Sequence, residues 1–195
     1  MTDEDARPAP PRARAIENAT GVPFDVWTAR LEDAGGRGMD HAALARTIHE
    51  RWNIEDWWAQ GIAIAFEQSI GRRDVGQTST GDFAVSASRT VPSAPDAVLE
   101  AWDAFQDAAR RARLGLGEVR TSSTEAWRYW RVDGPDGSRV SVNLRAKDDG
   151  AAGGAPRSIL AIEHKGLADA DAREAWKTTW KHVLDAFVAT LEETR

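Results

Sequence analysis

The C-terminal part of the chain pairs an apolar strand with a long amphipathic helix. The strand covers residues 158–164 and breaks at Lys165-Gly166. In the helix that follows, large apolar residues recur at steps of three and four and therefore share one face. They are Trp176, Trp180, Val183, Leu184, Phe187, Val188 and Leu191. A face with two indoles must be covered, and the preceding strands are its expected partner. A helix that grips a curved sheet often leaves a pocket, so the stripe predicts both an architecture and a cavity.

The second half of the chain predicts strands with one further helix. We expect strands at residues 82–91, 118–123, 125–133, 138–146 and 158–164, and a helix at 96–114. The run Asp-Gly-Pro-Asp-Gly at 133–137 is typical of a hairpin turn. Val140, Val142 and Leu144 alternate with polar residues, which indicates one buried and one solvated face. The order β-α-β-β-β-β-α predicts an α+β domain at 81–195, an antiparallel sheet wrapped on the C-terminal helix.

The first part of the chain carries helical signals. Residues 13–71 predict a compact four-helix unit, in which Pro23 suits a first helical turn and Asp40 can cap a helix. Residues 1–12 are acidic and rich in proline, which predicts a disordered tail. The polar residues 72–80 predict a linker.

Composition and charge exclude several classes of function. The chain has no cysteine, which rules out a disulfide framework and a thiol nucleophile. Residues 13–71 hold five Arg and Lys against nine Asp and Glu, and residues 81–195 hold sixteen against eighteen. Neither part has the basic surplus that nucleic-acid phosphates attract, so we expect no nucleic-acid partner. The sequence contains no apolar run of membrane-spanning length and no signal-peptide pattern, which predicts no membrane insertion and a cytoplasmic location.

Two stretches of the second half resemble the START-like superfamily. They are residues 83–98, Phe-Ala-Val-Ser-Ala-Ser-Arg-Thr-Val-Pro-Ser-Ala-Pro-Asp-Ala-Val, and residues 162–170, Ile-Glu-His-Lys-Gly-Leu-Ala-Asp-Ala, followed by Trp176. They are most similar to the branch named after activators of the Hsp-ninety ATPase. The resemblance covers about residues 82–192 and implies a helix-grip fold around a hydrophobic cavity. Members bind lipids, hormones or polyketides, and some are cyclases. This chain has fewer predicted strands than the fuller family, which implies a small or collapsed cavity.

Residues 13–71 resemble a small bacterial helical domain of unassigned function that is often fused to START-like domains. The matching positions are Gly21-Val22-Pro23-Phe24, Trp27, Asp56-Trp57-Trp58-Ala59-Gln60, Glu67-Gln68 and Gly71. Phe66 stands where that family more often has tyrosine. The resemblance implies a bacterial protein and supplies no chemistry.

A ligand held between the closing helix and the sheet would be lined by apolar and aromatic side chains. The predicted lining residues are Val85, Trp102, Trp127, Tyr129, Val142, Leu144, Trp176 and Trp180.

Titratable residues offer weaker candidates for chemistry. Glu163 and His164 lie at a strand end, where an acid–base role is conceivable and a structural pairing is favoured. The other histidines, His41, His49 and His182, lack metal-ligand spacing, so we expect no metal and no cofactor.

Four arginines lie on adjacent predicted strands. A solvated outer sheet face is the favoured interpretation for Arg139 and Arg145. Arg128 shares its face with Trp130, and Arg131 shares its face with Trp127 and Tyr129, so one of Arg128 and Arg131 points inward.

Three functions remain open. The first is binding of a small apolar molecule between the closing helix and the sheet. The second is a protein-interaction or stress-related regulatory module with a filled core, which would use the acidic helical unit or an exposed tryptophan. The third is a cyclase- or hydrolase-like enzyme that uses Glu163 or His164.

Overall fold

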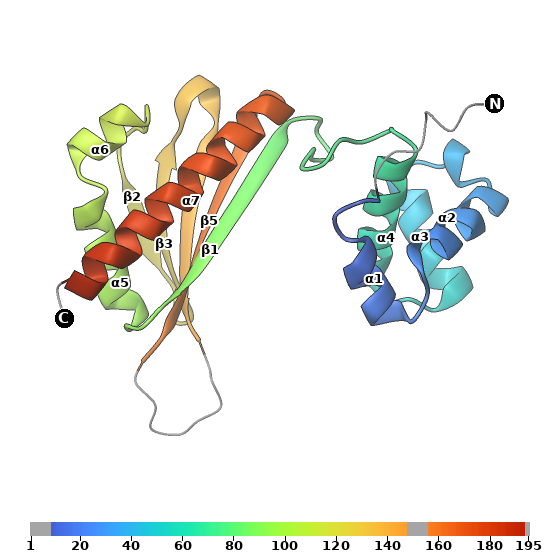
Figure 1. Cartoon of the computed structure of the whole chain (residues 1–195), viewed down its shortest axis with the longest axis horizontal. Coiled ribbons are helices and arrows are strands. Elements are labelled where there is room, and N and C mark those ends of the chain that lie inside the picture. Colours follow the sequence, from blue (N-terminus) through green and yellow to red (C-terminus); the bar gives the residue numbers. More distant parts are fainter. Residues whose placement is uncertain (1–8, 148–155, 194–195) are drawn as a thin grey trace. The chain divides into compact units, whose positions relative to one another are not determined.

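The computed structural model describes residues 9–147 and 156–193 (Figure 1). The chain divides into two compact units, one ending at Val75 and the other beginning at Gly76. This division falls inside the predicted linker. The backbone N–H groups of Arg72 and Arg73 donate to the Glu67 carbonyl of the first unit, whereas the Gly76 carbonyl accepts from Ala84 in the second. Residues 1–8 of the predicted tail lie outside the described residues.

The first unit is helical, as the sequence predicts. Its described elements are α1 (Ala13–Thr20), α2 (Phe24–Asp33), the 3-10 turn η1 (Gly36–Gly38), α3 (His41–Trp52) and α4 (Asp56–Ser69). The Asp40 carboxylate caps α3 by accepting from the backbone N–H of Ala43 at 2.7 Å. Gly36 is needed where it stands, because a Cβ there would lie 2.7 Å from the Leu31 carbonyl oxygen. The core of this unit includes Ile16, Trp27, Leu31, Leu44, Ile48, Ile62 and Phe66.

The second unit contains a five-stranded antiparallel sheet in the order β1-β5-β4-β3-β2. Its strands are β1 (Phe83–Val91), β2 (Arg120–Ser123), β3 (Trp127–Asp133), β4 (Arg139–Ala146) and β5 (Ser158–Leu167). The predicted α+β class and helix-grip arrangement are confirmed. One boundary differs, because β5 runs on past His164 until Leu167 pairs with Phe83. Gly166 allows this extension by adopting a φ of 78°.

Three α-helices of the described residues accompany the sheet. Helix α7 (Ala170–Glu193) packs across β1 and β5, and α5 (Pro95–Phe105) packs on β3 and β4 (Figure 1). Helix α6 (Ala108–Arg113) follows α5 directly. The sequence predicts a single helix over 96–114, and the structure breaks it at Gln106. The Asp107 carboxylate accepts from the backbone N–H of Arg110 at 2.7 Å and starts α6 in a new direction.

The core of the second unit lies between the sheet and these helices. Alternate residues of β3, β4 and β5 face it, as the predicted alternation requires. It includes Trp102, Trp130, Val132, Val140, Val142, Leu144, Leu160, Ile162, Trp180, Leu184 and Phe187.

Candidate functional site

The aromatic stripe of α7 packs closely on the sheet. Trp180 is fully buried and Trp176 is half-buried. Their rings stack with centroids 5.4 Å apart, and the Trp176 ring lies 4.5 Å from the imidazole of His164 on β5. Further along α7, the Phe187 ring meets Trp102 of α5 at 5.1 Å. At these positions the space between α7 and its neighbours is therefore filled by aromatic side chains.

His164 is fully buried and bonded through both ring nitrogens. The Trp180 indole N–H donates to Nδ1 at 3.2 Å, which leaves the proton of the neutral ring on Nε2. Nε2 then donates to Ser138 Oγ at 2.8 Å, and this hydroxyl donates to the Pro135 carbonyl at 2.7 Å. Each group in this series donates a hydrogen bond to the next, from Trp180 on α7 through His164 on β5 to the β3–β4 turn. Gly134 fits this turn because a Cβ there would lie 2.4 Å from Ser138 Oγ.

Burial also sets the charge of His164. Desolvation lowers the pKa of the imidazole from 6.5 to about 4, so the ring is neutral near pH 7. Its neighbour Glu163 is on the other side of β5, half-buried, with its carboxylate 2.9 Å from Lys165 Nζ. The two sequence candidates for acid–base chemistry therefore lie on opposite faces of the strand.

The residues predicted to line a cavity divide between the two faces of the sheet. Six of them belong to the core under α5 and α7 or pack against it, namely Val85, Trp102, Val142, Leu144, Trp176 and Trp180. Trp127 and Tyr129 lie on the opposite face of β3, because Trp130 and Val132 occupy its core side. They do not face the space between the helix and the sheet.

The outer face of β3 carries a stack of aromatic and cationic groups. The Trp127 and Tyr129 rings stack with centroids 6.3 Å apart. The Arg131 guanidinium lies 4.3 Å from the Tyr129 centroid, and that of Arg145 lies 5.8 Å from the Trp127 centroid. Arg128 is the arginine on the core side, where its Nη2 lies 3.0 Å from Asp96 Oδ2 on α5. Of the two arginines Arg128 and Arg131, Arg128 is therefore the one that points inward.

A pocket lies beside α7, at the break between α5 and α6. Its volume is about 250 Å³. We call it the α7 pocket, and its lining residues are Phe105, Gln106, Arg110, Arg113, Leu114, His182, Val183 and Ala186. The walls are mainly apolar, and the polar groups come from the break and from the exposed side of the two helices.

Gln106 is the unusual member of this lining. Its side chain is only 1% exposed, yet neither its amide oxygen nor its amide nitrogen has a hydrogen-bond partner among the described residues. Its backbone is fully engaged, since its N–H donates to the Trp102 carbonyl and its carbonyl accepts from Arg111 Nη1 at 2.6 Å. A buried amide without partners costs about 1–3 kcal/mol, so Gln106 places a polar group at this pocket for which the described residues supply no hydrogen bond. Sequence reasoning missed Gln106, because it lies within a run that predicts one continuous helix.

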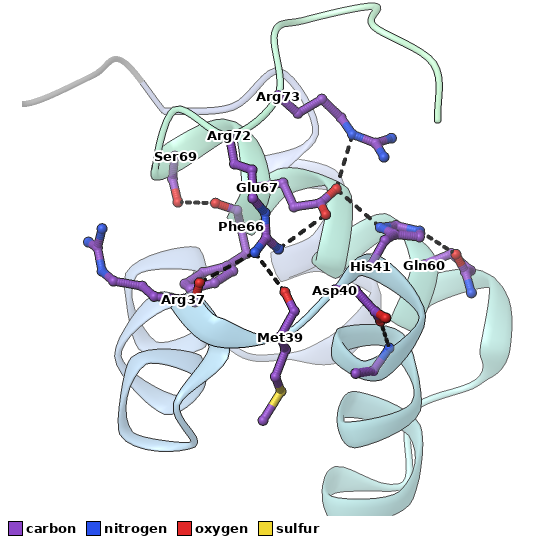
Figure 2. Close-up of polar contacts among 11 residues, drawn as sticks. Arg37, Met39, Asp40, His41, Gln60, Phe66, Glu67, Ser69, Arg72 and Arg73 are labelled. Atoms are coloured by element: carbon purple, nitrogen blue, oxygen red, sulfur yellow. Dashed lines mark hydrogen bonds and ion pairs between the residues drawn. The ribbon is translucent and has the colours of Figure 1, made fainter. Parts of the chain in front are cut away.

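The helical unit contains a buried charge cluster, shown in Figure 2. The Glu67 side chain on α4 is 5% exposed. Its carboxylate lies 3.2 Å from Arg72 Nη2, 3.0 Å from Arg73 Nε and 3.1 Å from His41 Nδ1. Nη1 of Arg72 also donates to the Met39 carbonyl at 2.6 Å, so the cluster ties the end of α4 to the start of α3. Both oxygens of the carboxylate are therefore paired, which indicates a structural role for this cluster.

Trp57, by contrast, is 66% exposed at the start of α4. The Arg12 guanidinium lies 5.3 Å from its ring centroid. Adjacent residues of a helix cannot share one face, and the neighbouring Trp58 packs against the core of this unit.

The described residues contain no group of three or more His, Cys, Asp or Glu placed to hold a metal ion. Within the same residues, no helix is both long and apolar enough to cross a membrane.

The chain matches no known protein-family model and no curated protein. Among solved structures, CalU16 from Micromonospora echinospora is similar over 59% of this chain and 78% of its own, with 14% identity and a TM-score of 0.36. Mll3558 from Rhizobium loti is similar over 55% and 96%, with 16% identity and a TM-score of 0.31. The Zhui aromatase/cyclase from a Streptomyces species is similar over 57% and 94%, with 16% identity and a TM-score of 0.28.

Proposed function

We propose that the second unit binds a small, largely apolar molecule, and that it does so in the α7 pocket. The observation that carries the proposal is the buried amide of Gln106, which has no partner among the described residues and lies in a lining shared with Phe105, Leu114, Val183 and Ala186. Binding pockets characteristically combine apolar walls with a few placed polar groups, and an amide offers both a donor and an acceptor.

The volume limits the size of the ligand. Pockets for drug-sized molecules are usually roughly 300–1,000 Å³, and this pocket has about 250 Å³. A compact ring system or a short chain suits it better than a lipid or a polyketide. The six core-facing residues of the predicted lining then support the pocket as packed framework, without direct contact with the ligand.

Filling the pocket tests the proposal. The probe is N-phenyl-1-naphthylamine, a neutral aromatic amine whose fluorescence rises in apolar surroundings. Ala186→Phe places a ring in the pocket from an exposed position of α7, so we expect a loss of most of the fluorescence response. Ala175→Phe is the matched control, because Ala175 is also exposed on the same helix and lies three turns away. Equal responses from both variants would refute the pocket as the binding site.

A second substitution tests the amide itself. Gln106→Leu keeps the approximate volume and removes the unpartnered polar atoms, so we expect a chain that is more stable by about 1–3 kcal/mol and binds its ligand less well. Urea denaturation measures the stability. If Gln106 holds only water, the stability will change little, since water already satisfies the amide.

A protein-interaction function has one specific observation in its favour, the exposed ring of Trp57. Pull-down with the wild type and with Trp57→Ser compares the partners captured. A protein retained by the wild type alone would support this second function. The enzymatic alternative lacks such support, because both nitrogens of His164 are already engaged.

A further inference from the structure

The α7 pocket has a cationic rim in an acidic protein. The whole chain carries a net charge of -6, yet no Asp or Glu is among the pocket's lining residues. Two arginines of α6 are among them, Arg110 and Arg113, together with the imidazole of His182 from α7.

These three side chains differ in how many contacts they already make with the protein. Arg110 donates to the Phe105 carbonyl at 2.7 Å, lies over the Phe105 ring at 4.2 Å, and is 3.7 Å from the Asp107 carboxylate. Arg110 is therefore part of the wall, and Asp107 offsets its charge. Arg113 and His182 are exposed, and neither side chain makes a hydrogen bond or an ion pair within the part of the chain that the structure describes.

Asp107, an acid beside Arg110, is held in place. The Asp107 carboxylate accepts from the Arg110 backbone N–H, and this bond, with the charges of Arg110 and Arg113, lowers the pKa of Asp107. The Asp107 carboxylate is thus bound at the start of α6 and lies beside Arg110. The side chains of Arg113 and His182 have no such bond within the described residues and can contact a ligand.

We infer that the ligand is an organic anion, a small molecule with an apolar body and a carboxylate or similar group. This inference rests on the proposed function and adds the ligand's charge. The apolar body lies against Phe105, Leu114 and Val183. The Gln106 amide bonds a polar atom of the body, and the anionic group lies at the mouth, between Arg113 and His182. An apolar floor with positive groups at its rim matches such an amphipathic molecule in both shape and charge.

A matched pair of probes tests the charge separately from the pocket. N-phenyl-1-naphthylamine is neutral, and 8-anilinonaphthalene-1-sulfonate has nearly the same ring system with a fixed negative charge. Fluorescence titrations of the full chain with each probe, at low and at high NaCl, give the two affinities. We expect the sulfonate to bind more tightly at low salt and to lose this advantage at high salt.

Arg113→Gln removes a guanidinium that makes no ion pair with the described residues, and Arg113→Gln with His182→Gln removes the imidazole as well. We expect the sulfonate affinity to fall about two- to fivefold for Arg113→Gln, because exposed ion pairs are worth this much, and to fall further when the imidazole donor is also removed. The affinity of the neutral probe should stay unchanged. Arg46→Gln is the charge control, since Arg46 is exposed on α3 of the other unit and makes no ion pair with the described residues.

The outcomes separate the two proposals. If both probes bind equally and respond equally to Arg113→Gln, the site prefers no anion and this inference is wrong, while the proposed function stands. If Ala186→Phe leaves sulfonate binding unchanged, the anion binds elsewhere and the inference is again wrong. If neither probe binds the wild type, the proposed function itself fails.

Discussion

His164 is the residue at which three separate elements meet. Through one imidazole, Trp180 of α7 is linked to Ser138, which follows the β3–β4 turn, and β5 lies between them. A protonated ring could not accept the bond from the Trp180 indole, so the linkage requires the neutral form. Because burial lowers its pKa, His164 does not exchange protons near pH 7. The same burial makes the hydrogen bonds through this ring dependent on pH.

That dependence has a definite sign. The unfolded chain binds a proton at His164 near pH 6.5, and the folded chain binds it only near pH 4. Between these values the unfolded state holds more protons, so His164 makes the folded state less stable as the pH falls, by up to roughly 3 kcal/mol. Above pH 6.5 its contribution is constant.

Substitution of His164 checks this prediction. Urea denaturation at pH 7 and pH 4.5 gives the loss of unfolding free energy on acidification. We expect a smaller loss for His164→Gln than for the wild type, because the amide does not titrate. The control His182→Gln removes an exposed imidazole from α7 and leaves the buried ring in place. An unchanged acid loss in His164→Gln would show that other groups account for it.

The break between α5 and α6 is the element that creates the α7 pocket. A continuous helix would place the side chains after Phe105 along the same axis, whereas the cap at Asp107 turns Arg110, Arg113 and Leu114 toward α7. The sequence did not reveal the break, because an aspartate inside a helical pattern is compatible both with a helix interior and with a cap. The burial of Gln106 depends on that choice.

Removal of the cap should therefore affect binding as well as stability. Asp107→Ala loses the bond from the Arg110 N–H, and N-cap losses cost about 1 kcal/mol. We expect α6 to loosen, with weaker binding of both naphthalene probes. Asp40→Ala is the matched control, because it removes a cap of the same 2.7 Å length from α3 in the other unit. It should destabilise that unit and leave probe binding alone. If Asp107→Ala binds both probes like the wild type, α6 is not a required wall.

In strand β3 the sequence alone does not predict which face is buried. Alternation separates Trp127 and Tyr129 from Trp130 and Val132, but both sets are apolar, so the pattern alone does not say which faces the core. Contacts with α5 decide it. The Trp130 indole N–H donates to Asp103 at 2.8 Å, and Arg128 pairs with Asp96. In β4 the opposite face is polar, and there the predicted inward set of Val140, Val142 and Leu144 is the buried set.

At the scale of the whole chain, the elements and their order follow from local patterns. Helix stripes, a capping aspartate and strand alternation each give a local answer, and these answers agree with the α+β fold. The candidate site does not follow from them. It requires a buried amide, a helix break, the Arg113 guanidinium and the His182 imidazole to lie together, and no local sequence pattern predicts that these groups are neighbours.

The two units have separate cores, which leads to the last prediction. The core cluster of the first unit runs from Ile16 to Phe66, and that of the second from Phe83 to Phe187, with no residue in common. We expect fragments 9–75 and 76–195 to unfold cooperatively on their own, followed by circular dichroism during heating. All α7 pocket residues belong to the longer fragment, so it should bind both probes with the affinity of the full chain. A longer fragment that folds but binds neither probe would mean that the helical unit contributes to the site, which contradicts a pocket formed by α5, α6 and α7 alone.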